Sequence, residues 1–362
     1  MDNIDDDWEN FLQGDDILYD NDSNQNVEQN KPIILQRTNV NEIPKCSEIY
    51  ISTKTKISYL NKNDIDIKNI FWKIPILDYS SPKNGIIKKQ IKYSSTDKSD
   101  VENITEQLKN VKYFEEQIIE HIENPEGRIK YKDQRKISVG ISKKDILSYR
   151  SKKKRAFFNC FVIIMRLLDD NQFKEMHVKV FNTGKLEIPG IQTDILLDKV
   201  LQLLVNILRP VLGDDLMYDS HKSETVLINS NFNCGYFIDR DKLYDILKYK
   251  YRINSNFDAC SYPGIQCKFY YDKLLINDEK SNQNGQQPKH KNFDEVSFMI
   301  FRTGSVLVVG KCEEYVLYDI YDFIKNILEL EYNNIHSITD HTPITSNKQR
   351  KKKIRKKIIL FD

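Results

Sequence analysis

The sequence predicts an α+β fold built from a duplicated unit. Residues 178–208 and 298–328 align without a gap, and self-similarity at a fixed offset is typical of a repeated structural unit. Each copy has the pattern of a β-hairpin followed by an amphipathic helix, and helices gathered on one face of an antiparallel sheet make an α+β architecture. The identical aligned residues include Phe181 and Phe301, Thr183 and Thr303, Gly184 and Gly304, Gly190 and Gly310, and Leu197 and Leu317.

The first unit begins with two short elements. Alternating side chains over 47–60 predict a strand. Residues 64–74 predict a short helix with Asn63 or Asp64 as its N-cap. Further along the chain, the dense apolar run 157–168 predicts a second strand.

A hairpin and a long helix complete the first unit. The hairpin covers 176–191 and turns at Gly184, because glycine adopts the positive φ of a tight turn without steric cost. The helix that follows has Thr193 or Asp194 as its N-cap, and Pro210 lies just past its predicted end.

The second unit repeats this order of elements. A strand is predicted over 224–237, a helix over 239–251 and another strand over 265–275. A hairpin over 298–311 and a helix over 313–330 follow.

These patterns organise the chain into two repeats with flanking segments. Residues 1–45 are rich in Asp and Asn and predict a disordered acidic arm. The first repeat covers 46–212 and contains an insertion at about 79–152, and the second covers 213–330. Residues 331–362 form a basic tail.

The insertion is polar and Lys-rich, with one amphipathic stretch that predicts a helix near 100–123 between mobile flanks. Either a partner-binding role or a surplus loop explains such a segment.

Charge is balanced overall but unevenly placed. Charged residues make up 30% of the 362, yet the formal net charge is +2. The first twenty residues are acidic and 350–357 are basic. The basic run fits phosphate contacts or a nuclear localisation signal, and a solubilising tail explains it equally well.

Other features argue against several classes of protein. The six cysteines lack CxxC spacing, which indicates reduced thiols in an intracellular protein. We expect neither a signal peptide nor a transmembrane helix, since no apolar run has the required length. His336 and His341 flank Asp340, but surface residues explain them better than a metal site without further ligands. No catalytic constellation stands out, so the sequence predicts neither an enzyme nor a cofactor.

The two faces of the repeated hairpin differ between the copies. One face of each strand pair packs on the helices, because side chains alternate along a strand. The opposite face is apolar from Met299 to Val309 in the second copy, which fits either a binding surface or a second covering layer. In the first copy it carries Lys179 and Glu187, and such a face makes a poor dry core.

These motifs resemble the core of the TATA-binding protein family. The F-x-T-G turn occurs twice, each time with a later glycine and a helix. Residues 161–166 resemble the family's second strand, 228–234 the first strand of its second repeat, and 262–268 its stirrup motif. The resemblance covers roughly 47–78 and 155–330.

The resemblance implies a saddle of two pseudo-symmetric halves, with a curved antiparallel sheet and helices on the convex face. The concave face would lie on the minor groove of A/T-rich promoter DNA, which presents few hydrogen-bonding groups to an apolar sheet. Aromatic wedges would kink the duplex, a mode for which this family is the best-known example. Double-stranded DNA, a factor of the transcription factor IIB type and RNA polymerase are the implied partners.

The resemblance also implies which residues insert into DNA. The hairpin wedges are Phe181 and Phe301. The stirrup wedge of the second half is Tyr262, and that of the first falls on Cys160 in a gapless alignment or on Phe158 two residues earlier. The other implied DNA-binding residues are Asn229 in the groove, Arg166 and Lys268 on phosphates, and the apolar residues Met299, Leu307 and Val309. Asp258 is implied to contact the factor of the transcription factor IIB type, with a solvated loop carboxylate as the alternative.

Glu187 departs most from the family pattern. A carboxylate facing the negative potential of the groove is repelled, and its unpaired burial costs on the order of several kcal/mol. We expect Lys179 to neutralise it across the hairpin. The second half is therefore expected to bind DNA as the family does, and the first half more weakly or at another sequence.

Two functions stay open at this point. The first is an initiation factor that binds and bends promoter DNA, and the second is a protein-interaction module with weak or no DNA binding. The abundance of Asn, Lys and Ile and the long insertion favour a large DNA virus as the source. The expected location is the nucleus or, for a viral protein, a cytoplasmic virus factory or the virion.

Overall fold

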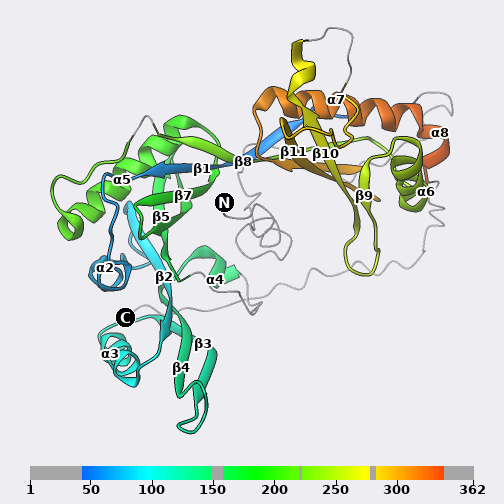
Figure 1. The fold of residues 1–362 in the computed structure, drawn as a ribbon. Helices are drawn as coiled ribbons and strands as arrows, with labels where there is room; N and C mark the ends of the chain where they lie inside the picture. The colour runs from blue at the N-terminus through cyan, green and yellow to red at the C-terminus, as the bar shows by residue number, and fades with distance from the viewer. Residues whose placement is uncertain (1–42, 148–157, 220–221, 278–282, 338–362) are drawn as a thin grey trace, which may run out of the picture. The chain divides into compact units, whose positions relative to one another are not determined.

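Two compact units make up the part of the chain that the computed structural model describes, which is residues 43–147, 158–219, 222–277 and 283–337. Unit 1 contains residues 56–224 of this part, and unit 2 contains residues 43–55 and those from 225 onward. Each unit contains antiparallel strands with its long helix packed on one face, so the α+β prediction is confirmed (Figure 1). Residues 1–42 of the acidic arm and 338–362 of the basic tail, which include Asp340 and His341, lie outside the described residues. The predicted tail is wrong at its start, because Glu331 and Ile335 are buried and 332–335 form a helix.

Unit 1 holds six strands of its own and four helices. The strands hydrogen-bond in the order β3-β4-β2-β5-β6-β7, and β1 (Tyr50–Tyr59) lies next to β7. The strands are β2 (Gly85–Ser95), β3 (Phe114–Glu123), β4 (Tyr131–Gly140), β5 (Cys160–Asp169), β6 (Gln172–Phe181) and β7 (Lys185–Ile191). The helices are α2 (Ile67–Lys73), α3 (Lys98–Lys109), α4 (Lys143–Leu147) and α5 (Asp194–Leu212).

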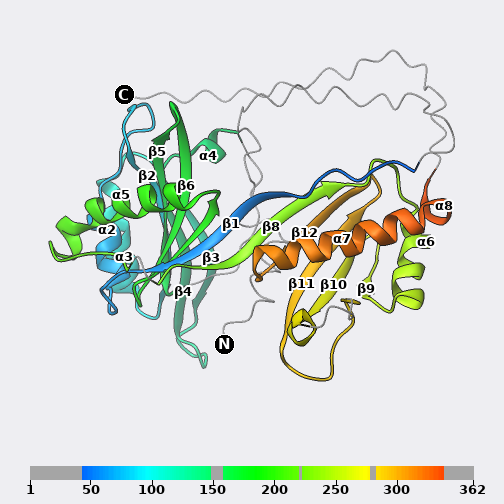
Figure 2. The same cartoon turned by 90° about the horizontal axis from the view of Figure 1, so that it is seen from above.

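Unit 2 repeats the arrangement of strands around its hairpin. The strand order is β8-β12-β11-β10-β9, and α7 runs along one face of these strands (Figure 2). The strands are β8 (Glu224–Asn233), β9 (Asn254–Asn256), β10 (Gly264–Asp272), β11 (Phe293–Phe301) and β12 (Ser305–Gly310). The helices are α6 (Arg240–Asp245) with a π-helical turn (Ile246–Lys250), α7 (Glu314–Leu330) and α8 (Tyr332–Ile335), and a 3₁₀ turn (Lys273–Asn277) follows β10.

The two long helices bury equivalent stripes of side chains. Spacings of three and four residues place these side chains on one helix face, where each contributes about 1.5–3 kcal/mol on full burial. The buried residues at matching positions are Leu197, Val200, Leu201, Leu204 and Leu208 in α5, and Leu317, Ile320, Tyr321, Ile324 and Leu328 in α7. The repeat in the sequence is therefore a repeat in the core.

The hairpin turns are also fixed by the same backbone hydrogen bonds. In each unit two carbonyls of the turn accept from two N–H groups of the segment that follows the unit's first strand. The bonds are Leu60 N to Gly184 O at 2.8 Å and Ile65 N to Asn182 O at 2.8 Å in unit 1, and Cys234 N to Gly304 O at 2.9 Å and Ile238 N to Arg302 O at 2.9 Å in unit 2. Both turns therefore position their hairpins identically within their own unit.

Two helix ends differ from the prediction. The N-cap of α2 is Asp66, whose side chain accepts a hydrogen bond from the backbone N–H of Asn69. Helix α5 continues past Pro210 to Leu212 and ends at Gly213. Proline is tolerated in this last turn because it removes only one helical hydrogen bond there.

The insertion is part of the sheet, and the predicted helix over 100–123 is wrong in its second half. Helix α3 ends at Lys109, and 114–123 forms β3. Strand β3 pairs with β4, β4 with β2, and β2 with β5. As an edge strand exposed on both faces, β3 lacks the apolar alternation from which a strand is predicted.

Lys89 is a buried lysine of β2 that closes the end of α2. Its Nζ donates to the carbonyl of Ile74 at 2.7 Å and to that of Trp72 at 3.3 Å, and it lies 5.0 Å from the centre of the Phe71 ring. Burial disfavours the charged form and lowers the pKa of Lys89 to about 8.

We expect this lysine to make stability rise with pH. Above about pH 8 the folded amine loses its proton while the unfolded chain keeps it, so the unfolded state binds more protons. Between about pH 7.5 and about pH 9.5, wild type should gain about 2 kcal/mol in the free energy of unfolding relative to Lys89→Met, measured by urea denaturation. Lys109→Met, an exposed lysine of α3, is the control and should follow wild type. Equal pH dependence in wild type and Lys89→Met would contradict the assignment.

Candidate nucleic-acid interface

The sheet of unit 2 has an opposite face, turned away from α7, that carries the residues implied to touch DNA. Strand register builds this face in cross-strand rows. In the first row Met299 faces Leu307 on one side and Gln266 on the other. Asn231 faces Leu307, and Asn256 faces Gln266. The row therefore places two apolar side chains between amides.

A second row lies one step along the strands. Val309 faces Ser297 and Asn229, and Lys268 faces Ser297 and Asn254. Val309 and Asn229 are buried. Lys268 is 40% exposed at its side chain and pairs with Glu295 at 2.6 Å. Asn229, implied to lie in the groove, and Lys268, implied to bind a phosphate, are thus on the same face of the sheet.

Two aromatic rings lie together at one end of this face. The Tyr262 and Phe301 ring centres are 5.9 Å apart, at an interplanar angle of 57°, and both side chains are half-buried. The Tyr262 hydroxyl donates to the sulfur of Met299 at 3.3 Å, and Met299 is fully buried. Gly264 faces Phe301, and a Cβ there would lie 3.1 Å from each ring. Glycine thus lets the two rings approach.

Strand register in unit 1 shows where the two stirrup candidates of the first half lie. Cys160 faces Phe181, as Gly264 faces its hairpin phenylalanine in unit 2. Phe158 precedes Cys160 by two residues, as Tyr262 precedes Gly264. Phe158 is half-buried, whereas Cys160 is buried. Phe158 therefore holds the position equivalent to Tyr262.

Lys179 and Glu187 form the ion pair that the sequence predicts. They face each other across β6 and β7, with Nζ 2.8 Å from Oε1. Their side chains are 19% and 18% exposed, so the pair is largely withdrawn from water. The pairing cancels the charge of Glu187 on the opposite face of unit 1.

Arg166 is buried, although the resemblance implies that it binds a phosphate. It is 8% exposed, and its Nη1 donates to the carbonyl of Tyr79 at 2.6 Å. The guanidinium carbon lies 5.6 Å from the Tyr79 ring centre and 5.1 Å from that of Phe173. Its Nε and Nη2 atoms have no protein hydrogen-bond partner among the described residues. Both atoms are buried, so the guanidinium does not present these donors at the surface of the described residues.

A short helix of the insertion lies on the opposite face of unit 1. Lys88, which faces Ile164 of β5, binds both carboxylate oxygens of Asp145 in α4 at 2.7 Å. The backbone N–H of Lys143 donates to Glu175 of β6 at 3.0 Å. These two contacts hold α4 against the opposite face of unit 1.

Asp258 organises the loop before Tyr262. Its carboxylate accepts hydrogen bonds from the Cys260 N–H at 3.0 Å and from the Ser261 hydroxyl at 2.7 Å. The hydrogen bond from Ser261 is the main cause that lowers the pKa of this exposed carboxyl. The residue implied to contact a partner also fixes its own loop.

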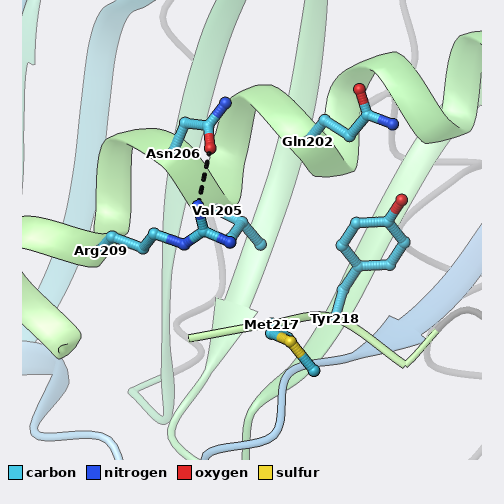
Figure 3. Close-up of a pocket in the computed structure, with 6 residues that line it drawn as sticks. All are labelled: Gln202, Val205, Asn206, Arg209, Met217 and Tyr218. Atoms are coloured by element: carbon cyan, nitrogen blue, oxygen red, sulfur yellow. Dashed lines mark hydrogen bonds between the residues drawn. The ribbon is translucent and has the colours of Figure 1, made fainter. Parts of the chain in front are cut away.

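One hollow lies beside the outer side of α5. It measures about 480 Å³ and is lined by residues of α5 and of the segment that follows it (Figure 3). The lining residues are Gln202, Val205, Asn206, Arg209, Met217 and Tyr218. Arg209 donates to Asn206 at 3.4 Å and to the carbonyl of Leu216 at 3.2 Å. The guanidinium of Arg209 is thus engaged with the chain itself.

Among the described residues, no group of three His, Cys, Asp or Glu side chains is arranged to hold a metal ion. None of the helices in that part of the chain is long and apolar enough to span a membrane.

Comparison with known proteins gives one curated relative. No family model matches the chain. The TATA-box-binding protein-like protein of Acanthamoeba polyphaga mimivirus is 24% identical over 209 residues, which is 52% of this chain and 53% of that protein. In sequence, this chain is similar to that TATA-box-binding protein-like protein. It spans about half the length of the curated relative that it matches. Among solved structures, the TBP of Methanococcus jannaschii matches with 12% identity and a TM-score of 0.36, over 79% of this chain and 99% of that chain.

The sequence motifs locate most of the opposite face of unit 2. They miss Asn231 and Gln266, which stand beside Leu307 and Met299 in the first row. The signal was present, because Asn231 is two residues from Asn229 in a strand and therefore shares its face. The resemblance implies an apolar surface at this place, so a search guided by it does not select amide side chains.

Proposed function

We propose that this chain is a transcription initiation factor that binds and bends A/T-rich promoter DNA through the minor groove. In this role it helps to recruit RNA polymerase together with a factor of the transcription factor IIB type. The observation that carries the proposal is the aromatic pair Tyr262 and Phe301, with Phe158 and Phe181 at the equivalent positions of unit 1.

Half-buried aromatic rings at a sheet end suit insertion between base pairs. Unstacking one base step costs on the order of a few kcal/mol, which the wider protein contact along a bent duplex offsets. Pyrimidine–purine steps deform most easily, so A/T-rich sites with TA steps are the preferred target. The two aromatic pairs give each unit one such point of insertion.

Phosphate contacts are assigned to Lys268 and Arg166. Lys268 exchanges Glu295 for a phosphate at little cost, because exposed ion pairs contribute about 0–1 kcal/mol. Arg166 is assigned from the resemblance, and its buried Nε and Nη2 donors would have to be uncovered to meet a phosphate. Asp258 is assigned to the contact with the factor of the transcription factor IIB type.

The direct test is a gel-shift and bending assay with the full chain and A/T-rich duplexes. The expected result is a retarded complex whose mobility depends on the position of the site in the fragment, as bending requires. Retardation without bending, or no complex with a chain whose circular dichroism is that of the folded protein, would rule out this function.

A second candidate function is a protein-interaction module of the transcription machinery with weak or no DNA binding. The observation that favours it is α4, which Asp145 and Lys143 fasten to the opposite face of unit 1. A folded wild-type chain that binds no duplex in the assay above is the result that selects this function.

Glu187→Val tests how far unit 1 takes part. The substitution removes a negative charge from the opposite face and breaks the ion pair between Glu187 and Lys179. We expect about three- to tenfold tighter DNA binding, as for one charge contact of moderate strength. Footprinting should show the added protection over one half of the site. Glu115→Val, an exposed residue of the edge strand β3, is the matched control and should leave protection unchanged. Equal footprints for wild type and Glu187→Val would contradict a DNA-binding role limited by this carboxylate.

A further inference from the structure

Two amide side chains stand on the opposite face of unit 2 where an apolar surface is expected. Asn231 of β8 faces Leu307, and Gln266 of β10 faces Met299. Because Leu307 and Met299 also face each other, the order across the strands is Asn231, Leu307, Met299 and Gln266. The amides therefore flank the apolar pair on both sides.

The two amides differ from their polar neighbours in having no internal partner. Within the described part of the chain, neither Asn231 nor Gln266 forms a side-chain hydrogen bond. Asn233 binds the Gly235 N–H, and Asn254 binds the Tyr270 hydroxyl. Both Asn231 and Gln266 are half-buried. A ligand bound on this face would remove water from their amide groups, which would then lack hydrogen-bond partners unless the ligand supplies them.

The minor groove supplies such partners in a form that depends on sequence. An A·T pair presents only acceptors there, the adenine N3 and the thymine O2, and a G·C pair adds the guanine N2 amino donor. An apolar side chain over that amino group leaves it without a partner, which disfavours G·C pairs. An amide has both an N–H donor and a carbonyl acceptor, so it satisfies either kind of base pair.

We propose that unit 2 accepts a G·C pair within its minor-groove site, with the carbonyl oxygen of Asn231 or Gln266 taking the hydrogen bond from the guanine amino group. This inference rests on the proposed DNA-binding function and deepens it, since it concerns which base pairs the site admits. The DNA target is thus A/T-rich with a permitted G·C pair at one or two fixed positions, and it is not restricted to A·T pairs throughout.

The test measures affinity for a series of duplexes in which one G·C pair moves through an A/T-rich site. Wild type is expected to bind at least one G·C position within about threefold of the A/T-only duplex. The double variant Asn231→Val and Gln266→Ile should lose about tenfold or more at that position and keep its affinity for the A/T-only duplex. Asn326→Leu, an exposed amide of α7 on the other face of the sheet, is the matched control and should behave as wild type.

A second arm isolates the guanine amino group. Inosine lacks this group but pairs with cytosine, so the double variant should regain its affinity when inosine replaces guanine. Wild type alone also tests whether the guanine amino group is accepted, because it should then bind the guanine duplex at least as well as the inosine duplex. If wild type binds the A/T-only duplex but rejects guanine at every position by more than about tenfold, this inference is overturned and the DNA-binding function stands. If wild type binds no duplex, both are overturned.

Discussion

Phe301→Ala is expected to weaken binding to an A/T-rich duplex by about ten- to a hundredfold and to remove most of the bend. Phe301 lies beside Tyr262 at the end of the opposite face, with ring centres 5.9 Å apart. A single aromatic ring stacked on a base contributes about 1–3 kcal/mol, which corresponds to this range of affinity. The bend depends on it more strongly, because the kink persists only while the wedge occupies the opened base step.

The matched control for this experiment is Tyr318→Ala. Tyr318 is an aromatic residue of α7, 49% exposed, and α7 packs on the other face of the same sheet. We expect its removal to change neither affinity nor bending. Thermal unfolding of both variants separates a lost DNA contact from a lost fold. Equal loss of affinity in the two variants would argue against a wedge role for Phe301, as would an unchanged bend in Phe301→Ala.

Gly304→Ala is expected to destabilise unit 2 by about 3 kcal/mol or more. Gly304 has φ of 80°, where a side chain is strained, and its Cβ would lie 2.3 Å from the carbonyl oxygen of Tyr236 and 2.8 Å from the sulfur of Cys234. Backbone strain of this kind costs about 1–3 kcal/mol, and displacement of the neighbouring backbone adds to it. The turn also accepts the hydrogen bond from the Cys234 N–H, which the displacement would lengthen.

Denaturant unfolding measures this effect, with Thr303→Ala as the control at the adjacent exposed position. Gly184→Ala should behave alike in unit 1, since its Cβ would lie 1.8 Å from the carbonyl oxygen of Lys62. A loss of less than about 0.5 kcal/mol in Gly304→Ala would mean that the turn adapts and does not fix the hairpin.

The repeated hairpin and helix could be predicted from sequence because their signals are local. Gly184 and Gly304 mark turns within a few residues of the strands they join, and the buried positions of α5 and α7 recur every three or four residues. The pairing of Lys179 with Glu187 followed from the same local register across one turn.

The remaining features depend on contacts between distant segments. β2 pairs with β5, although the paired residues are about 75 apart in sequence. β3 has no apolar alternation, so no local pattern predicts it as a strand. The burial of Arg166 arises from Tyr79, which lies in the inserted region. The choice of Phe158 over Cys160 needed the register of β5 against β6, because a gapless alignment cannot detect a shift of two residues.

The connections within the two central strand pairs have consequences for how the halves fold. β5 and β6 are joined by Asp170 and Asn171, both at positive φ as in a tight hairpin turn, whereas β10 and β11 are joined by residues 273–292. A tight turn lets β5 and β6 form their hydrogen bonds from the turn outward in about 1–10 μs. The second pair must first close a long loop, and the chain entropy lost in doing so slows its nucleation. The β5–β6 pair is thus expected to form faster than the β10–β11 pair, and during synthesis it also leaves the ribosome first.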